Sequence, residues 1–427
     1  MTKKINQILN QVLIQVEPSK EDLELVDTSL KDFLKRFNQN LKKLKIKAEV
    51  FIGGSFAKKT VIKKDSYDVD VFVRFDKKYD DKDLSGLTAK ALKGFKNLLK
   101  VHGSRDYYRV IINSELYIEL IPVKKINRPE QAENITDLSY SHVKYINKNI
   151  KSQKILNDIK IAKAFCHANH CYGAESYIGG FSGYSLELLV YYYKGFINFL
   201  KAMTKVKKDK LVIDIEKYYK NKSVVLMDIN SSKLNSPIIL VDPTYKQRNT
   251  LAALSQETFN KFQTECSRFL KNPSIKSFEV QKTDLEKIKS DAIKNKDEFV
   301  LLESMTPKQP GDVAGSKLLK FYKHLSEELN SSFEIKNKGF NYNKKQSARY
   351  FFVAKKRNEI IFEGPLIKDK ESVLKFKKEH KKTFTKEDKI YSKEKISMNL
   401  PQFIEFWKNK NSKKIKEMYI EKLEIVE

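Results

Sequence analysis

Two aspartates one residue apart give this sequence its clearest chemical signal. Asp68 and Asp70 alternate with Val69, Val71 and Val73, so in a strand both carboxylates share one face while the valines face a core. Two acids held this close repel each other unless a cation lies between them. Carboxylate oxygens suit a hard ion such as magnesium, which typically binds protein carboxylates together with substrate phosphates. The pair therefore predicts a metal site on a strand.

A glycine-rich turn precedes these acids. Gly53 and Gly54 let the backbone approach a ligand closely, and we expect Ser55 to cap a helix that runs through Ala57 to Ile62. A helix that begins after a glycine turn can bind an anion. The alternative is a half-buried edge strand whose acids face water, which two alternating acids alone would favour. The turn at a fixed distance upstream favours a nucleotide and metal site instead.

A polymerase-type site with two metal ions needs a third carboxylate, because one ion activates the attacking hydroxyl and the other holds the triphosphate. The segment 115–123 reads as a strand that follows another at 108–113. Glu119 has apolar neighbours in it, which is an unusual position for a carboxylate without a partner. Glu115 lies on the same face but nearer the start of the strand, and is the second choice.

Three later segments add a family resemblance to this pattern: 163–176, 180–189 and 241–254. A Gly-Gly-Ser turn, alternating acids on a strand and a later strand acid form the nucleotidyltransferase signature shared by poly(A) polymerases, oligoadenylate synthetases and CCA-adding enzymes. With the three later segments in this order, the sequence resembles the archaeal-type, class I tRNA CCA-adding enzyme. The resemblance is strong from residue 53 to 254 and weaker from there to the C-terminus.

The resemblance implies nucleotide-binding roles for Gly54, Ser55, Lys58, Ser139, His142, Lys163, Tyr172 and Arg248. Ser55 and Lys58 stand where the family contacts the triphosphate, and Lys163 and Tyr172 stand where it holds the triphosphate. Arg248 stands where the family reads the Watson–Crick edge of the incoming base. A planar guanidinium with fixed donors can pair with cytosine or adenine edges and reject others. Without the flanking motif, an ordinary salt bridge would be the better interpretation of Arg248.

The resemblance also implies an activity, in which the chain adds and repairs the 3′ CCA of tRNA from CTP and ATP and releases pyrophosphate. Asp68 and Asp70 would bind two magnesium ions, and Glu119 would help the ion that lowers the pKa of the terminal ribose hydroxyl. Two alternatives stay open. One is a related poly(A) or oligoadenylate-type transferase, and the other is a catalytically weak tRNA-binding protein on the same scaffold.

Two departures from the family pattern bear on the chemistry. The third carboxylate is Glu119 where an aspartate is usual, and its longer arm can alter metal placement. Lys58 stands where arginine is common, so a point charge replaces a bidentate fork.

The elements that position these residues indicate an α+β, multidomain fold. Apolar spacing predicts helices over 3–16, 19–44 and 87–99, the second opened by a capping box of Ser19 and Asp22. We expect a polymerase beta-like catalytic head with a mixed sheet (1–130), a helical neck that selects the nucleotide (131–256), and an α+β body and helical tail that bind tRNA (257–427).

Composition agrees with a nucleic-acid partner without proving it. The 427 residues carry a formal net charge of +29, which favours a polyanion, although lysine-rich helix faces in contact with solvent give the same excess. The resemblance implies that the basic C-terminal half binds the acceptor stem and TΨC arm of tRNA. A homodimer is one assembly open to the chain. Three cysteines and no apolar run of about 18 residues favour a cytoplasmic protein. The cysteines and histidines of 166–171 read as helix packing rather than as a zinc site.

Overall fold

The structure is a computed structural model that describes residues 2–207, 209–281, 283–357, 359–380, 382–394 and 397–427. Contacts divide the chain into a first unit, residues 1–281, and a second unit, residues 282–427. None of the helices described has both the length and the apolar character that crossing a membrane requires.

The first unit contains a five-stranded mixed sheet in the order β1-β2-β5-β4-β3. Its strands are β1 (Ala48–Ile52), β2 (Tyr67–Phe75), β3 (Leu98–Val101), β4 (Tyr107–Ile111) and β5 (Leu116–Lys124). The central pair β2 and β5 is parallel, whereas β1, β4 and β3 join by antiparallel pairing. The mixed sheet expected of the head is therefore confirmed.

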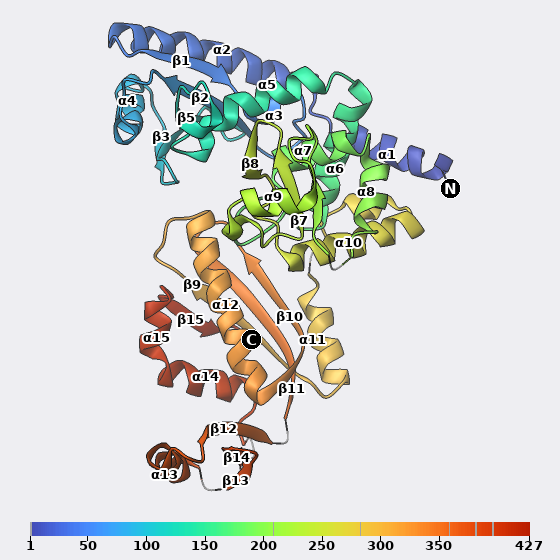
Figure 1. Cartoon of the computed structure of the whole chain (residues 1–427), viewed down its shortest axis with the longest axis vertical. Helices are drawn as coiled ribbons and strands as arrows, with labels where there is room; N and C mark the ends of the chain where they lie inside the picture. The colour runs from blue at the N-terminus through green and yellow to red at the C-terminus, as the bar shows by residue number, and fades with distance from the viewer. Residues whose placement is uncertain (1, 208, 282, 358, 381, 395–396) are drawn as a thin grey trace. The chain divides into compact units, whose positions relative to one another are not determined.

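Two helices close one face of this sheet, α2 (Lys20–Lys43) and α4 (Leu84–Ala91). The predicted capping box begins α2, because the Ser19 hydroxyl accepts from the Asp22 amide and the Asp22 carboxylate accepts from the Ser19 amide. Side chains at helical spacing then enter the core that the strand valines also form. Figure 1 shows α2 lying along the sheet, and this packing fixes the strand that carries the alternating acids.

The remainder of the first unit is mainly helical around one aromatic-rich core. Its helices are α1 (Thr2–Val16), α3 (Gly54–Ala57), α5 (Ser139–Asn149), α6 (Gln153–Ala168), α7 (Gly183–Tyr192), α8 (Phe196–Met203), α9 (Lys222–Asp228) and α10 (Gln256–Lys271). A small sheet of β6 (Leu211–Ile213), β7 (Ile238–Asp242) and β8 (Tyr245–Asn249) adjoins them. Helix α10 packs into this core through Phe259, Phe262 and Phe269, so it belongs to the first unit. The division into head, neck and body stays a prediction.

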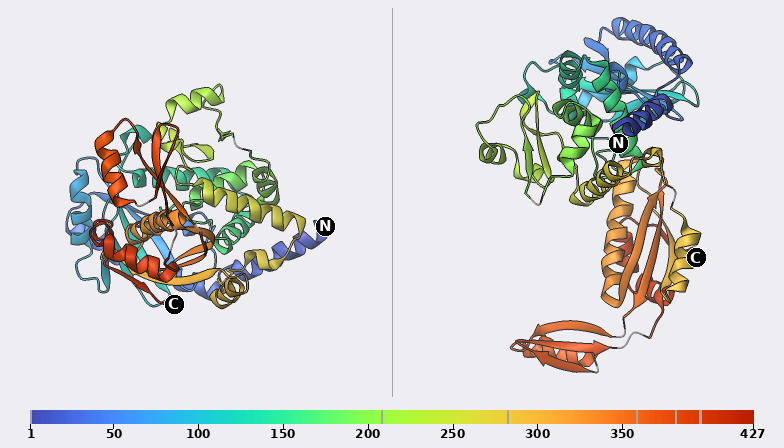
Figure 2. Two further views of the ribbon diagram at one scale, coloured as in Figure 1. Left: turned by 90° about the horizontal axis from the view of Figure 1, so that it is seen from below. Right: turned by 90° about the vertical axis from the view of Figure 1, so that its right-hand side faces the viewer.

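The second unit is built on a four-stranded sheet in the order β10-β11-β9-β15. Its strands are β9 (Glu298–Met305), β10 (Phe333–Tyr342), β11 (Ser347–Lys356) and β15 (Lys422–Ile425), and its helices are α11 (Leu285–Lys294), α12 (Asp312–Ser332), α14 (Leu400–Lys410) and α15 (Ser412–Glu417). Figure 2 shows α12 running along the sheet. Tyr350 and Phe352 are fully buried beneath it, so these strand aromatics form part of the core of the second unit.

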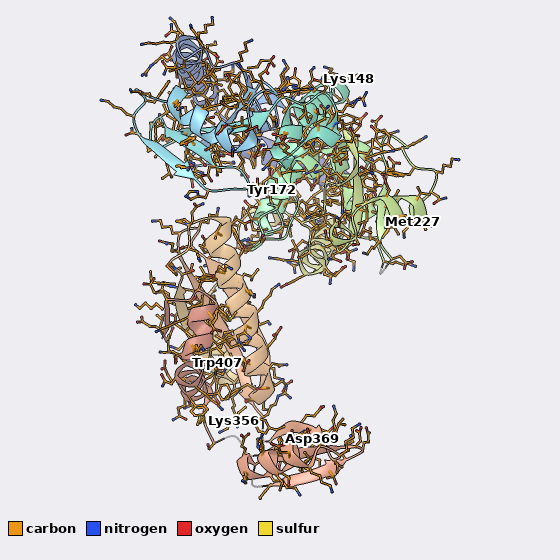
Figure 3. The ribbon with its side chains drawn as sticks, turned by 60° about the vertical axis from the view of Figure 1, so that its left-hand side comes forward. Lys148, Tyr172, Met227, Lys356, Asp369 and Trp407 are labelled. Atoms are coloured by element: carbon orange, nitrogen blue, oxygen red, sulfur yellow. The ribbon has the colours of Figure 1, made fainter. Side chains whose placement is uncertain are left out.

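A second, smaller sheet in this unit has the order β12-β14-β13, with β12 (Ile360–Leu366), β13 (Thr383–Lys386), β14 (Lys389–Glu394) and the helix α13 (Lys370–Glu379) beside it. Figure 3 labels Asp369, which caps α13 by accepting from the Ser372 amide, and Trp407, which lies on α14. The helix and strands of this unit agree with the α+β class predicted for the C-terminal part.

Candidate active site

The three predicted carboxylates lie in one row across two central strands. Because β2 and β5 pair in parallel, Asp70 is opposite Glu119, and Asp68 is two residues away on the same face. On the other face Val69 and Val71 are fully buried. Glu115 precedes β5 and its side chain is exposed. The structure therefore places Asp68 and Asp70 on one strand face, as the alternation predicted, with Glu119 opposite Asp70 on β5. It leaves Glu115 outside the paired strand.

The glycine turn packs directly against these acids. The Gly53 amide donates to the Asp70 carbonyl at 2.8 Å. Gly54 has a φ of +57°, and a Cβ added there would lie 1.7 Å from Oδ2 of Asp70. Only glycine permits both the left-handed backbone and this approach, so the turn seats the Asp70 carboxylate.

The predicted helix after this turn is much shorter than expected. Helix α3 ends at Ala57, Gly53 rather than Ser55 occupies its N-cap, and Gly53 makes no side-chain cap. Lys59 adopts a φ of +58°, which ends the helix, and the Thr60 amide returns to donate to the Ser55 carbonyl at 2.9 Å. The prediction that Ser55 caps a helix to Ile62 is wrong. The turn presents Ser55 and Lys58 through a tight loop instead.

Each outer carboxylate of the row has a basic partner. Lys64 Nζ donates to Oδ1 of Asp68 at 2.7 Å. Arg109, on the neighbouring strand β4, donates to Oε1 of Glu119 from Nη2 at 2.6 Å and from Nε at 3.2 Å. Burial raises the pKa of Glu119, and Arg109 opposes that shift. Sequence reasoning missed Arg109, although a charged residue on an adjacent predicted strand is a recognisable cross-strand partner.

Asp70 is the carboxylate that is most unfavourably placed as an anion. Burial, and then the charges of Glu119 and Asp68, raise its pKa to about 7. Among the residues described, no three such side chains already converge as a metal site. The donor set nevertheless fits a divalent cation, because hard oxygens surround a carboxylate whose like-charged neighbours a cation would neutralise.

Two predicted triphosphate residues meet at a buried acid that the sequence analysis did not single out. Glu187, on α7, accepts from Lys58 Nζ at 2.7 Å and from Lys163 Nζ at 3.0 Å. The Thr60 hydroxyl donates to the same carboxylate at 2.8 Å. Burial would raise the pKa of Glu187, but the two lysines lower it to about 2. The cluster joins the loop after α3 to helices α6 and α7.

A second buried acid joins the predicted base-reading residues. Asp242, at the end of β7, accepts from Arg248 Nη1 at 2.6 Å and from the Tyr184 hydroxyl at 3.1 Å, and lies 3.0 Å from Nε2 of His142. The His142 and Tyr184 rings stack with centroids 4.1 Å apart. Burial lowers the pKa of His142, although Asp242 opposes the shift. Arg248 thus forms a salt bridge while its side chain stays 23% exposed.

The remaining predicted residues lie on the helices around these clusters. Ser139 begins α5, three residues before His142, and is half-buried. Tyr172, labelled in Figure 3, follows α6, and its ring centroid lies 4.1 Å from that of His167. A Cβ added to Gly183 would lie 2.8 Å from the Tyr172 hydroxyl, so glycine makes room for the phenol at the start of α7.

The cysteines belong to the core. Cys166, Cys171 and Cys266 are buried in the aromatic-rich cluster of the first unit, and the part of the chain that is described contains no candidate metal cluster. The burial of Cys166 and Cys171 agrees with the helix packing predicted for them.

Two family models match successive segments of the first unit. The family described as "Nucleotidyltransferase domain" matches residues 30–142, and "tRNA nucleotidyltransferase, second domain" matches residues 157–279. Together the two matches span more than half of the chain. Poly(U) polymerase Cid1 has a similar fold, with a TM-score of 0.51 and 13% identity over 66% of this chain and 100% of that chain.

Curated relatives narrow the family. The CCA-adding enzyme of Nanoarchaeum equitans is 37% identical over 64% of this chain and 66% of its own length. That of Methanocaldococcus jannaschii is 28% identical over 91% of this chain and 87% of its own length. That of Saccharolobus shibatae is 28% identical over 76% of this chain and 72% of its own length. With both domain matches in the expected order and a row of acids on the paired strands, the chain belongs to the CCA-adding enzyme family of tRNA nucleotidyltransferases.

Proposed function

We propose that this chain adds the 3′-terminal CCA to tRNA, and repairs it, from CTP and ATP without a nucleic-acid template. The observation that carries the proposal is the row of Asp68, Asp70 and Glu119 on paired strands of the first unit. The names of the curated relatives support the same activity. A poly(A)-type transferase would use the same acids, so the distinction depends on the base-reading residues.

The acids would hold the metal that nucleotidyl transfer needs. Asp68 and Asp70 are the residues that would bind two magnesium ions, with Glu119 as the third ligand. When bound, such ions lower the pKa of the attacking hydroxyl and neutralise phosphate charge. The reaction would join the terminal ribose O3′ to the α-phosphorus in line and break the bond from the α-phosphorus to the oxygen of the β-phosphate. Pyrophosphate would leave, and the hydroxyl proton would pass to solvent. The chain contributes chiefly positioning and charge neutralisation.

Two clusters of side chains in the first unit would hold the incoming nucleotide, one at its triphosphate and one at its base. Lys58, Lys163 and Tyr172 would bind the triphosphate, with Ser55 and Gly54 supplying the turn beside Asp70. Arg248 would pair with the Watson–Crick edge of cytosine or adenine. Asp242 holds one guanidinium nitrogen at 2.6 Å, which fixes the plane in which the remaining donors read the base. His142 and Ser139 would complete that end.

The tRNA partner is supported by charge and by the second unit. A formal net charge of +29 favours a polyanion. Duplex RNA is normally recognised through its phosphates and shape, so an acceptor stem and TΨC arm could be held without base contacts. The second unit supplies many lysines on its strands and helices for such contacts.

The direct test is incorporation of single nucleotides into a tRNA that lacks its CCA. We expect CTP to be incorporated in magnesium by the wild type, and expect Asp70→Asn to abolish incorporation. Asp65→Asn is the matched control, because Asp65 is exposed in the loop before β2. Long tails from ATP alone would favour poly(A)-type transfer. Tight tRNA binding without incorporation, in magnesium or manganese, would favour a binding protein.

A further inference from the structure

Glu187 is a fully buried carboxylate that no role proposed so far uses. Its side chain has 0% exposure, compared with 10% for Lys58 and 4% for Lys163. Lys163 Nζ also donates to the Thr60 carbonyl at 3.0 Å and hydroxyl at 2.7 Å. Residues from two separate segments, far apart in the sequence from each other and from Glu187, therefore converge on this carboxylate.

The charge of this cluster is not balanced. One carboxylate faces two ammonium groups, and the third partner, Thr60, is neutral. A buried ion pair needs only one lysine, and a buried charge in excess is costly unless a partner neutralises it. Burial lowers the pKa of Lys163 to about 8 even though Glu187 opposes the shift. The cluster is thus short of one anion.

The neighbours of the cluster indicate which anion it would accept. Lys58 Nζ lies 6.0 Å from the ring centroid of Tyr184, whose hydroxyl contacts Asp242. The charge of Lys58 also acts on Asp70 to lower its pKa, against the larger effect of burial. The excess positive charge therefore lies between the acid row and the base-reading group, where the phosphates of a bound nucleotide would be placed.

We propose that Glu187 is a positioning residue that holds the ammonium groups of Lys58 and Lys163 in place for the triphosphate of the incoming nucleotide. A lysine is a point charge on a flexible stem and lacks the rigid fork of arginine. The carboxylate supplies the fixed direction that Lys58 itself lacks. The inference rests on the proposed function only in taking a nucleoside triphosphate as the ligand of these lysines.

The test compares equilibrium binding of ATP and AMP to the full chain in EDTA, for wild type and Glu187→Gln. AMP lacks the β- and γ-phosphates, so the ratio of the two affinities isolates the part of binding that depends on the triphosphate. We expect Glu187→Gln to weaken ATP binding by about 10- to 100-fold, as for loss of charge-assisted hydrogen bonds. AMP binding should change by less than about two-fold, and Glu187→Asp should restore part of the ratio.

Two controls separate positioning from stability. Asp242→Asn removes the buried acid that contacts Arg248, and should weaken ATP and AMP binding alike without changing their ratio. The double variant Glu187→Gln/Lys163→Met removes one charge of each sign, and should recover the unfolding temperature lost in Glu187→Gln without recovering the ATP to AMP ratio. An unchanged ratio in Glu187→Gln, with only a lower unfolding temperature, would overturn the inference.

The outcome is independent of whether the chain adds CCA. If the wild type binds ATP no more tightly than AMP, the lysines do not hold a triphosphate and the inference fails. Suppose that the wild type adds no CCA but prefers ATP to AMP, and that Glu187→Gln lacks this preference. The inference then stands and the proposed function fails.

Discussion

At the scale of single residues, the acid row is balanced by cations of the chain itself. Lys64 contacts Asp68, and Arg109 contacts Glu119. Asp70 lies between these two acids, and burial and their like charges raise its pKa. A metal ion that binds Glu119 therefore competes with Arg109.

Arg109→Gln should lower the magnesium concentration needed for half-maximal nucleotide incorporation. Both partners are partly exposed, at 31% for Arg109 and 16% for Glu119, so we expect a modest change of about two- to five-fold. A magnesium titration of the incorporation rate measures it. Lys100→Gln, which removes a cation from the same sheet at its pair with Asp106, is the control. A higher magnesium requirement in Arg109→Gln would show that Arg109 orients Glu119 instead of competing for it.

Asp70 should make the stability of the metal-free protein depend on pH. Its folded pKa of about 7 lies above the unfolded value of 3.8, so its contribution to stability is present below the unfolded pKa and is lost as pH rises through the folded pKa. Asp70→Asn does not titrate, and should therefore gain stability over the wild type from pH 5 to pH 8. With the shift discounted for solvent screening, we expect about 1–2 kcal/mol.

Thermal unfolding in EDTA at both pH values measures this difference. Asp65→Asn should show the same difference from the wild type at both pH values. A pH-independent difference for Asp70→Asn would contradict the raised pKa.

At the scale of elements, a buried ion pair fixes the end of the head sheet. Arg105 Nη1 donates to Oδ1 of Asp137 at 2.7 Å, and both side chains are almost completely buried. Asp137 also accepts from the backbone amides of Lys124, Glu133 and Asn134. This carboxylate therefore joins β5 to the short helix η3 (Ile135–Leu138), which leads directly into α5 and His142.

Asp137→Ala should destabilise the first unit by about 3–5 kcal/mol, because it leaves a buried guanidinium without its main partner. Asp81→Asn removes the other carboxylate that Arg105 contacts. Because Asp81 is 39% exposed, this control should cost about 1 kcal/mol or less. Urea unfolding measures the free energy of unfolding of both variants. Equal losses of stability in the two would refute the assignment of Asp137 as the main partner.

Periodicity predicted the elements whose side chains alternate or repeat along one buried face. The valines of β2 and the apolar face of α2 are examples, and the Ser19–Asp22 capping box was predicted from local sequence alone. Two helix predictions are wrong where single residues adopt positive φ. Lys59 ends α3, while Gly94 and Asn97 separate α4 from β3 within the segment predicted as one helix.

The candidate site was predicted through residues that belong to a motif, and was missed where partners come from distant segments. Alternation placed Asp68 and Asp70 on one face, and the apolar neighbours of Glu119 indicated a carboxylate that needs a partner. Glu187 lies 129 positions from Lys58, and no periodic pattern relates the two. Only the packing of α7 against the loop after α3 brings them into contact.

At the scale of the whole molecule, the excess of positive charge should dominate tRNA binding. In the second unit, Lys308 and Lys317 lie over the ring of Tyr419, at 3.9 Å and 4.7 Å from its centroid. If each lysine neutralises a phosphate, Lys308→Ala and Lys317→Ala should each reduce the slope of log affinity against log salt by about 1. Filter binding across a range of salt concentrations measures the slope.

Lys289→Ala is the matched control for this series, because Lys289 is already paired with Glu427. Its salt slope should remain that of the wild type. Equal slopes in all variants would exclude phosphate contacts by Lys308 and Lys317.

The most direct test of the account is to determine which nucleotide is added to each of four tRNA substrates, ending at the discriminator base, after one C, after CC and after CCA. With all four nucleoside triphosphates and magnesium present, we predict cytidine on the first two, adenosine on the third and no addition to the fourth. Loss of all three additions in Asp70→Asn, but not in Asp65→Asn, would assign them to the acid row. Repeated adenosine on every substrate, or no addition to any, would contradict CCA addition by this chain.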